Sequence, residues 1–218
     1  MQLREDIEYH DSEQGSDEWH ALRLGKITGS CFSKLMGTAA AKEKYLCDRA
    51  NEIVTKSRCD SDESATGMHM ARGHEFEEVA ICKYTVATLT QVRRVGFVQL
   101  NEFAGCSPDG LVGDDGMIEI KVPDSNNYFR QILELNEKGV DAIPKDYYAQ
   151  MQFCMYVCDR KWCDYVLYNP KHETNGKSLF VLRVERDGSM QERISSVIEE
   201  SIARLKNYTT NYHQLKMN

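Results

Sequence analysis

The sequence predicts an α/β fold in which a central mixed β-sheet is flanked by helices. Three observations favour it. Helical patterns dominate the first 90 residues, strand patterns cluster at 92–122 and 162–185, and further helical patterns separate and follow these strands. The 218 residues contain four prolines and no internal repeat, so we expect a single domain over residues 1–218 with a sizeable core.

Two short helices are expected near the N-terminus. Ser16 can cap the first helix with its hydroxyl, and Gly25 can end it. Thr28 is expected to open the second helix, which continues through the apolar residues Phe32 and Leu35.

Longer helices are expected where apolar residues recur at helical spacing. Such spacing covers 42–55 and the long stretch 68–89, and the polar residues 57–67 between them predict a loop. The remaining helices lie between and after the strands, at 127–135, 146–157 and, as an amphipathic helix, 190–208.

The strands are predicted from alternation and from turn residues. Residues 92–100 alternate and predict one strand. Leu111 and Val112 form the first arm of a hairpin, residues 113–116 its turn and 117–122 its second arm. Two aromatic-rich strands are expected at 162–169 and 179–185.

The hairpin carries the strongest chemical signal. Side chains alternate between the faces of a strand, so Glu119 and Lys121 project together from the second arm. The return of the hairpin brings Asp109, in a Pro-Asp-Gly turn, near Glu119. Carboxylate oxygens suit Mg²⁺, and a nearby lysine can position or activate a water molecule. The alternative is a polar hairpin with a surface Glu–Lys pair, which this pattern alone leaves open.

Two polar residues fall on apolar helical faces. Glu77 shares its side with Ala80, Ile81 and Tyr84, where a carboxylate costs free energy unless it is paired or binds a metal. Gln150 also has apolar neighbours and needs hydrogen-bond partners, as part of either the core or a site.

The net charge of −7 argues against a generally basic nucleic-acid surface, but the charge is uneven. Residues 1–18 hold seven acidic residues and one basic residue, whereas residues 20–58 hold eight basic and three acidic residues. A local basic surface can bind phosphates, although ordinary solvated helix charges account for some of these residues. Arg23 precedes the expected helix start at Thr28, where helix amides and a guanidinium can hold a phosphate.

The eight cysteines include no C-x-x-C pair. Cys154, Cys158 and Cys163 form the closest cluster and raise the alternative of an iron–sulfur site. Packing is favoured, because Cys154 and Cys158 share one helical face, where free cysteines commonly act as small buried hydrophobes.

No apolar run is long enough to span a membrane and the N-terminus does not resemble a signal peptide, so a cytoplasmic protein without membrane contact is expected.

Several motifs occur together in order over residues 13–186. They are Glu13-Gln14-Gly15 with Trp19-His20, Leu22-Arg23-Leu24-Gly25, Ile27-Thr28, the helical segment 73–77, Cys106-Ser107-Pro108-Asp109-Gly110, Glu119-Ile120-Lys121, and Tyr148-Ala149-Gln150 with Gln152. On these motifs the chain resembles the lambda exonuclease or YqaJ-type viral recombinase family of the PD-(D/E)xK nuclease superfamily. The resemblance implies a PD-(D/E)xK, restriction-endonuclease-like core and a single nuclease domain.

The resemblance also implies roles for individual residues. The implied catalytic set is Asp109, Glu119, Lys121, Glu77 and Gln150. Of these, Asp109 and Glu119, with the backbone carbonyl of Ile120, would hold two Mg²⁺ ions, for which Mn²⁺ can substitute, and Lys121 would activate water.

Further implied roles concern the DNA. Arg23, Ser30 and Ser107 match the family's 5′-phosphate site, and Met70 stands where the family has an apolar wedge that separates the terminal base pair. The family's loop after Ser30 carries an arginine that reaches into DNA. Residues 37–44 lack one here, and Lys42 and Lys44 are the candidates to replace it.

The implied activity is that of a Mg²⁺-dependent 5′→3′ exonuclease. It would degrade one strand of double-stranded DNA from its ends to mononucleotides and leave a 3′ single strand for phage-type recombination by strand annealing. The implied partners are double-stranded DNA ends, further copies in a ring-shaped homotrimer, and a single-strand annealing protein, in the cytoplasm of a bacterial host of the phage or prophage.

Two other functions stay open. One is a restriction-like or Cas4-like endonuclease on the same core, against which the cysteine pattern and the Arg23 motif argue. The other is a catalytically inactive DNA-end-binding module, against which the intact set of Asp109, Glu119 and Lys121 argues.

Overall fold

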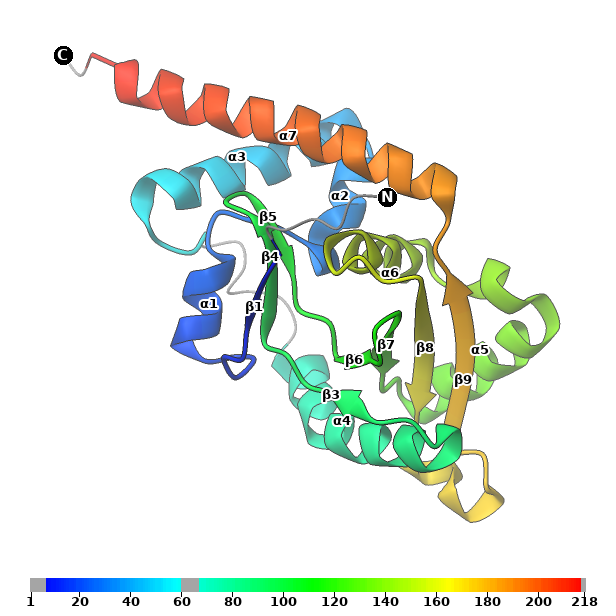
Figure 1. The fold of residues 1–218 in the computed structure, drawn as a ribbon. Helices are drawn as coiled ribbons and strands as arrows, with labels where there is room; N and C mark the ends of the chain where they lie inside the picture. The colour runs from blue at the N-terminus through cyan, green and yellow to red at the C-terminus, as the bar shows by residue number, and fades with distance from the viewer. Residues whose placement is uncertain (1–6, 60–66, 217–218) are drawn as a thin grey trace.

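The structure, a computed structural model, describes residues 7–59 and 67–216, with only the backbone described over 67–75. Helices pack around two mixed β-sheets (Figure 1), so the α/β class is confirmed and the strands divide between two sheets instead of one. The smaller sheet contains β1 (Glu8–His10), β2 (Ile27–Thr28), β4 (Phe97–Asn101) and β5 (Ala104–Cys106), in the order β1-β4-β5-β2. The larger sheet contains β3 (Val92–Arg93), β6 (Gly110–Val112), β7 (Gly116–Lys121), β8 (Trp162–Tyr168) and β9 (Leu179–Glu185), in that order.

The division between the sheets falls inside the predicted strand 92–100. β3 pairs with β6 in the larger sheet, whereas β4 pairs with β1 and β5 in the smaller one. Gly96 lies at the crossing and donates its N–H to the carbonyl of His10 (2.9 Å). A Cβ at Gly96 would stand 1.8 Å from the carbonyl oxygen of Ser12, so only glycine allows this close approach of two backbones.

The N-terminal helices differ in part from the prediction. The hydroxyl of Ser16 caps α1 (Asp17–Arg23) by accepting from the N–H of Trp19 (3.2 Å), as predicted. Thr28 is the N-cap residue of the second helical segment, as predicted, but its side chain makes no capping hydrogen bond, and it also lies on β2, which pairs in parallel with β5. The chain then forms the 3₁₀ helix η1 (Gly29–Cys31) and α2 (Phe32–Met36), so helical structure begins only at Gly29.

The longer helices follow their predicted order with shifted ends. They are α3 (Ala39–Thr55), α4 (Gly67–Thr88), α5 (Ser125–Lys138), α6 (Lys145–Val157) and α7 (Gly188–Gln214), with short 3₁₀ helices η3 (Gly139–Ala142) and η4 (Pro170–Asn175). α3 begins three residues earlier than predicted because the hydroxyl of Thr38 caps it by accepting from the N–H of Ala41 (3.3 Å). Within the described ranges, no helix is long and apolar enough to cross a membrane.

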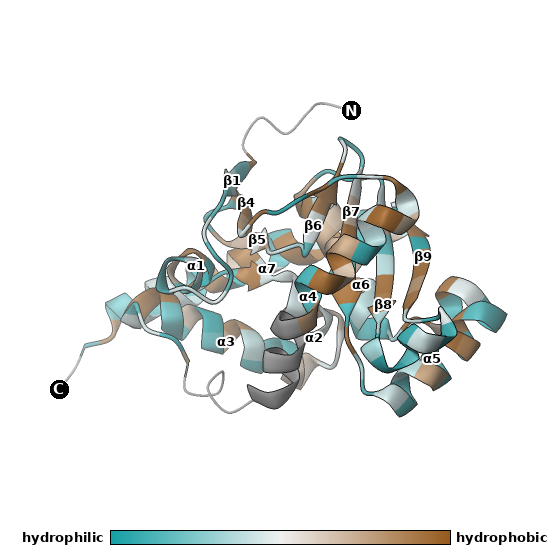
Figure 2. Cartoon of the chain, turned by 90° about the horizontal axis from the view of Figure 1, so that it is seen from below, coloured by the Kyte–Doolittle hydropathy of each residue, from teal (hydrophilic) through white to brown (hydrophobic). Residues whose placement is uncertain are grey.

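Strand β7 lies in the middle of the larger sheet and is buried on both faces. Ile118 and Ile120 pack against α4, whereas Met117 belongs to the main core around α6. By alternation, Glu119 and Lys121 share the face of Met117 and point toward α6. Figure 2 shows apolar residues gathered on β6, β7 and β8 inside the molecule and polar residues along the outer helices α3 and α5.

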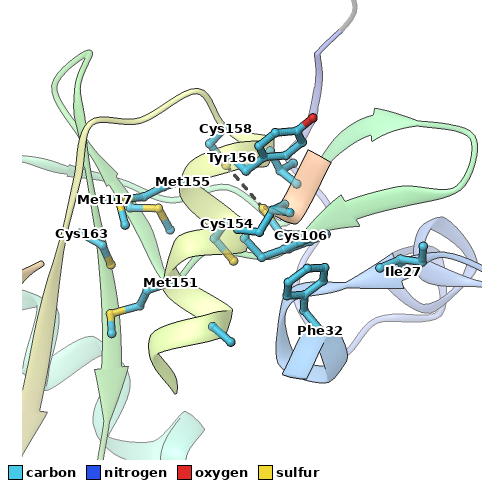
Figure 3. Packing of buried hydrophobic residues seen from close by; sticks show 14 of the residues in the cluster. Ile27, Phe32, Cys106, Met117, Met151, Cys154, Met155, Tyr156, Cys158 and Cys163 are labelled. Carbon is cyan, nitrogen blue, oxygen red and sulfur yellow. Dashed lines mark hydrogen bonds between the residues drawn. The ribbon is translucent and has the colours of Figure 1, made fainter. Parts of the chain in front are cut away.

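The clustered cysteines pack in the core next to α6. Cys154 on α6, Cys158 at its C-cap, Cys106 on β5 and Cys163 on β8 are buried and free. The Sγ atoms of Cys106 and Cys158 lie 3.5 Å apart (Figure 3). Burial raises the pKa of the Cys106 thiol, so it stays protonated and acts as a small apolar group.

Candidate active site

A cleft of about 710 Å³ brings the predicted site residues together. Its lining comes from α1, η1, α2, α3, α4, the β6–β7 hairpin, α5, α6 and the loops next to them. All the predicted site residues whose side chains are described line it, namely Arg23, Ser30, Glu77, Ser107, Asp109, Glu119, Ile120, Lys121 and Gln150. Met70 lies on α4 within residues 67–75, so its side chain is outside the described part of the structure.

The position of Asp109 follows from the end of the hairpin ladder. The last pair between β6 and β7 is Gly110 with Ile118, and Pro108, which precedes Asp109 and would come opposite Ile120, has no N–H to continue the ladder. Beyond the ladder, the Asp109 side chain is the acceptor in place of a backbone carbonyl, and its Oδ2 accepts the N–H of Ile120 at 2.6 Å. This hydrogen bond holds Asp109 beside Glu119, the proximity that the hairpin predicts.

Glu119 is a buried carboxylate with only one of its oxygens satisfied. The side chain is 1% exposed, and Oε1 accepts from Nζ of Lys121 (2.5 Å) and from Nε2 of Gln150 (2.7 Å). Oε2 is buried without a hydrogen-bond partner among the described residues. A buried charged oxygen without a partner is unfavourable, and a hard divalent cation would satisfy it.

The acidic groups perturb one another. Burial raises the pKa of Asp109 well above its usual range, and the nearby charges of Glu119 and Glu77 raise it further against the opposing effect of Lys121. Burial alone would lower the pKa of Lys121, but Glu119 and Asp109 outweigh burial and raise it. Lys121 is therefore an ammonium in this arrangement, and the surplus of carboxylates favours binding of a cation.

Arg94 is a site residue that the sequence did not indicate. It lies in the crossing between β3 and β4, and its Nη1 donates to Oε1 of Glu77 (2.5 Å) and to the carbonyl of Asp109 (3.1 Å). Glu77 itself is 14% exposed, as its place on an apolar helical face predicts, and Arg94 is the partner it needs. No sequence pattern identifies Arg94, because the pair depends on where the chain crosses between sheets.

The other end of the cleft suits an anion. The guanidinium of Arg23 lies over the ring of Trp19 at 4.2 Å and donates to the hydroxyl of Ser107 (3.1 Å). Nε1 of Trp19 also donates to that hydroxyl (2.8 Å), so Ser107 accepts twice and keeps its own O–H to donate to a ligand. Ser30, exposed on η1, faces the same space.

Further basic residues line this end. They are His20, Lys34, Arg49 and Arg58, all within the basic stretch 20–58 that the charge distribution indicates. Burial lowers the pKa of His20, and the nearby charges of Arg58 and Arg23 lower it further. Lys42 and Lys44, the candidates to replace a loop arginine, lie on α3 and pair with Glu200 (2.8 Å) and Asp48 (2.9 Å).

Comparison with known proteins identifies the family of this chain. The model of the YqaJ-like viral recombinase domain matches residues 18–161. Among solved structures, the alkaline exonuclease LHK-Exo of Laribacter hongkongensis is 31% identical with a TM-score of 0.79, over 91% of this chain and 97% of that chain. LHK-Exo in complex with dAMP gives 31% identity and a TM-score of 0.78, over 90% and 96%.

A phage-related exonuclease from Haemophilus somnus 129PT shares the fold, with 18% identity and a TM-score of 0.63 over 88% of this chain and 96% of that chain. No curated protein matches the chain. Because the domain model covers more than half of the chain and LHK-Exo is similar over nearly all of it, this protein belongs to the YqaJ-like viral recombinase family and has its PD-(D/E)xK fold.

Proposed function

We propose that this protein is a Mg²⁺-dependent 5′→3′ exonuclease that degrades one strand of double-stranded DNA from its ends to mononucleotides. Membership of the family supports a nuclease, and the relative solved with dAMP is an exonuclease. The observation that carries the proposal is one cleft with an acidic cluster at one end and, at the other, an anion-binding site formed by Arg23, Ser30 and Ser107. The 3′ single strand left behind would serve strand annealing.

The donor set fits a hard divalent cation. Asp109 and the unsatisfied Oε2 of Glu119 offer carboxylate oxygens. The N–H and carbonyl of one strand residue point to the same side, so the Ile120 carbonyl is directed toward the side of Asp109, which accepts the Ile120 N–H. When bound, two Mg²⁺ ions, or Mn²⁺ in their place, would polarise the phosphodiester and stabilise the leaving oxygen.

The protein's own groups would orient the reactants. Lys121 is held by Glu119 and by the ring of Tyr147, 4.7 Å from Nζ, so its ammonium can hold the attacking water in one direction. Gln150 fixes the Glu119 carboxylate through its Nε2 hydrogen bond, and Glu77 completes the acidic end.

The anion-binding site would determine the 5′→3′ direction of degradation. Arg23, Ser30 and Ser107 present a guanidinium and two hydroxyls that suit a dianionic terminal 5′-phosphate. A terminal phosphate bound there would set which nucleotide reaches the acidic end. Met70 on α4 would be the apolar wedge that separates the terminal base pair.

We further propose that the chain is one nuclease domain over 1–218 that assembles as a homotrimeric ring. The charge of −7 supports this, because a ring needs a positive surface only in its channel. The cellular setting would be the cytoplasm of a bacterial host, with a single-strand annealing protein of phage type as partner.

The test is digestion of linear duplexes labelled at the 5′ or the 3′ end, with Mg²⁺ and with EDTA, beside a supercoiled circle. We expect early release of the 5′ label as a mononucleotide, retention of the 3′ label in long strands, no product in EDTA and an intact circle. Cleavage of the circle would indicate the endonuclease instead. DNA-end binding without hydrolysis in Mg²⁺ would indicate the inactive module.

A further inference from the structure

Arg94 contacts two of the acidic residues of the cleft with one nitrogen. Its Nη1 reaches Oε1 of Glu77 at 2.5 Å and the carbonyl of Asp109 at 3.1 Å. Its Nη2 lies 3.5 Å from Oε1 of Glu78 on the same helix, α4. The guanidinium therefore links α4 to the turn that carries Asp109.

The charges at this end of the cleft are divided between two internal cations. Lys121 is bound to Oε1 of Glu119, and Arg94 is bound to Oε1 of Glu77. What remains for an external cation is Asp109 and Oε2 of Glu119, which has no partner among the described residues. Arg94 thus neutralises Glu77, one of three neighbouring carboxylates, and so weakens the electrostatic attraction of this end of the cleft for a cation.

The two internal pairs differ in exposure. The side chains of Lys121 and Glu119 are 25% and 1% exposed, whereas those of Arg94 and Glu77 are 42% and 14% exposed. Partly exposed ion pairs add little net stability, since water and salt compete for both groups. The pair of Arg94 with Glu77 is therefore the more strongly screened of the two.

We propose that Arg94 is an internal counter-ion that competes with divalent cations for the acidic end of the cleft. The inference rests on the proposed function, because it takes this acidic end to be the cation site. Arg94 would keep Glu77 neutralised until a cation arrives and would release it then. It is a positioning residue, acting on cation affinity through Glu77.

A purely structural role for Arg94 predicts the opposite sign. If its main task were to hold the Asp109 turn through the carbonyl, its loss would loosen Asp109 and weaken cation binding. If it acts as a competitor, its loss leaves Glu77 negative and strengthens binding. The direction of one affinity change therefore separates the two roles.

The experiment is a Mn²⁺ titration of DNA-free protein, with free Mn²⁺ measured by electron paramagnetic resonance. We expect Arg94→Gln to bind Mn²⁺ about three- to tenfold more tightly than the wild type, the effect of one nearby charge at intermediate dielectric. Arg93→Gln is the matched control. It removes the same charge from the adjacent residue, whose guanidinium lies 5.5 Å from the ring of Tyr9 and 4.0 Å from Asp11. We expect less than about a twofold change from it, because solvent screens that charge.

A double mutant tests the route through Glu77. In a Glu77→Gln background, Arg94→Gln should no longer raise Mn²⁺ affinity, since no carboxylate is released. Unchanged or weaker binding by a folded Arg94→Gln protein, or the same gain in the Glu77→Gln background, would overturn the inference. The proposed function fails by a different result: no Mn²⁺ binding by the wild type, or wild-type affinity in Asp109→Asn.

Discussion

Among single residues, Glu119 combines two opposite properties. One of its oxygens holds Lys121 and Gln150 in place, and the other is buried without a partner among the described residues. The first oxygen explains why the carboxylate is well oriented. The second makes the cation-free protein less stable than its packing alone would allow.

Glu119→Gln should separate these properties. The amide keeps the size of the side chain and removes both the unsatisfied charge at Oε2 and the ion pair with Lys121, so we expect loss of hydrolysis with a melting temperature close to that of the wild type, because the two effects on stability oppose each other. Digestion of labelled duplex and calorimetry give the two readings, and Glu134→Gln, an exposed change on α5, is the control. Wild-type hydrolysis by Glu119→Gln would remove Glu119 from the metal site.

Arg23→Ala should act on substrate choice. Charge-assisted hydrogen bonds contribute about 1.5–3 kcal/mol, so the preference of the wild type for 5′-phosphate over 5′-hydroxyl ends should fall about ten- to hundredfold. The quantity to measure is the ratio of the two rates, because general folding damage cancels from it. An unchanged ratio in the mutant would mean that the terminal phosphate binds elsewhere.

At the scale of elements, the packing of η1 against α6 depends on Gly29, which has no side chain. A Cβ on Gly29 would lie 2.7 Å from Sγ of Cys154, in the buried contact that sets Ser30 opposite α6. Close packing of this kind tolerates little added volume. The contact therefore connects the anion-binding site, through Ser30, to the helix that carries Gln150.

Gly29→Ala should lower the free energy of unfolding by about 1–3 kcal/mol through overpacking. Cys154→Ala in the same chain should restore part of that loss, because it removes the sulfur that the new methyl group meets. Urea denaturation measures both, and Gly188→Ala, where a Cβ meets nothing within 4 Å, should be close to neutral. Additive losses in the double mutant would show that the two positions are not in contact.

The elements also show what sequence patterns can predict. The long helices, the β6–β7 hairpin and β9 have enough residues for a clear period, and the hairpin alone brings Asp109 near Glu119. Strands β1, β2 and β5 have two or three residues each and depend on long-range pairs such as Ile27 with Ala104, so no local pattern predicts them. The pairing of Arg94 with Glu77 depends on the crossing at Gly96, for the same reason.

For the whole molecule, charge and assembly are linked. A protein with a net charge of −7 that binds DNA must concentrate its basic residues on one surface, and His20, Arg23 and Arg58 already lie together in the cleft. If further copies surround the DNA, each contributes such a surface to a shared channel.

Light scattering at micromolar concentration should therefore give a mass near three times 25.0 kDa. The expected reason is closure of a ring, so the mass should not rise further with concentration. A monodisperse monomer would contradict the channel and leave the acidic exterior unexplained.

The hydrogen bond from the Ile120 N–H to Asp109 attaches a backbone amide directly to the acidic cluster. That amide is a spectroscopic probe present in the natural sequence. In two-dimensional nitrogen–proton correlation spectra of deuterated protein, its resonance should move when a cation reaches Asp109, before any nucleotide is added. An inactive variant whose Ile120 signal still moves when the cation is added binds the ion but does not hydrolyse DNA. An inactive variant whose signal does not move no longer binds the ion.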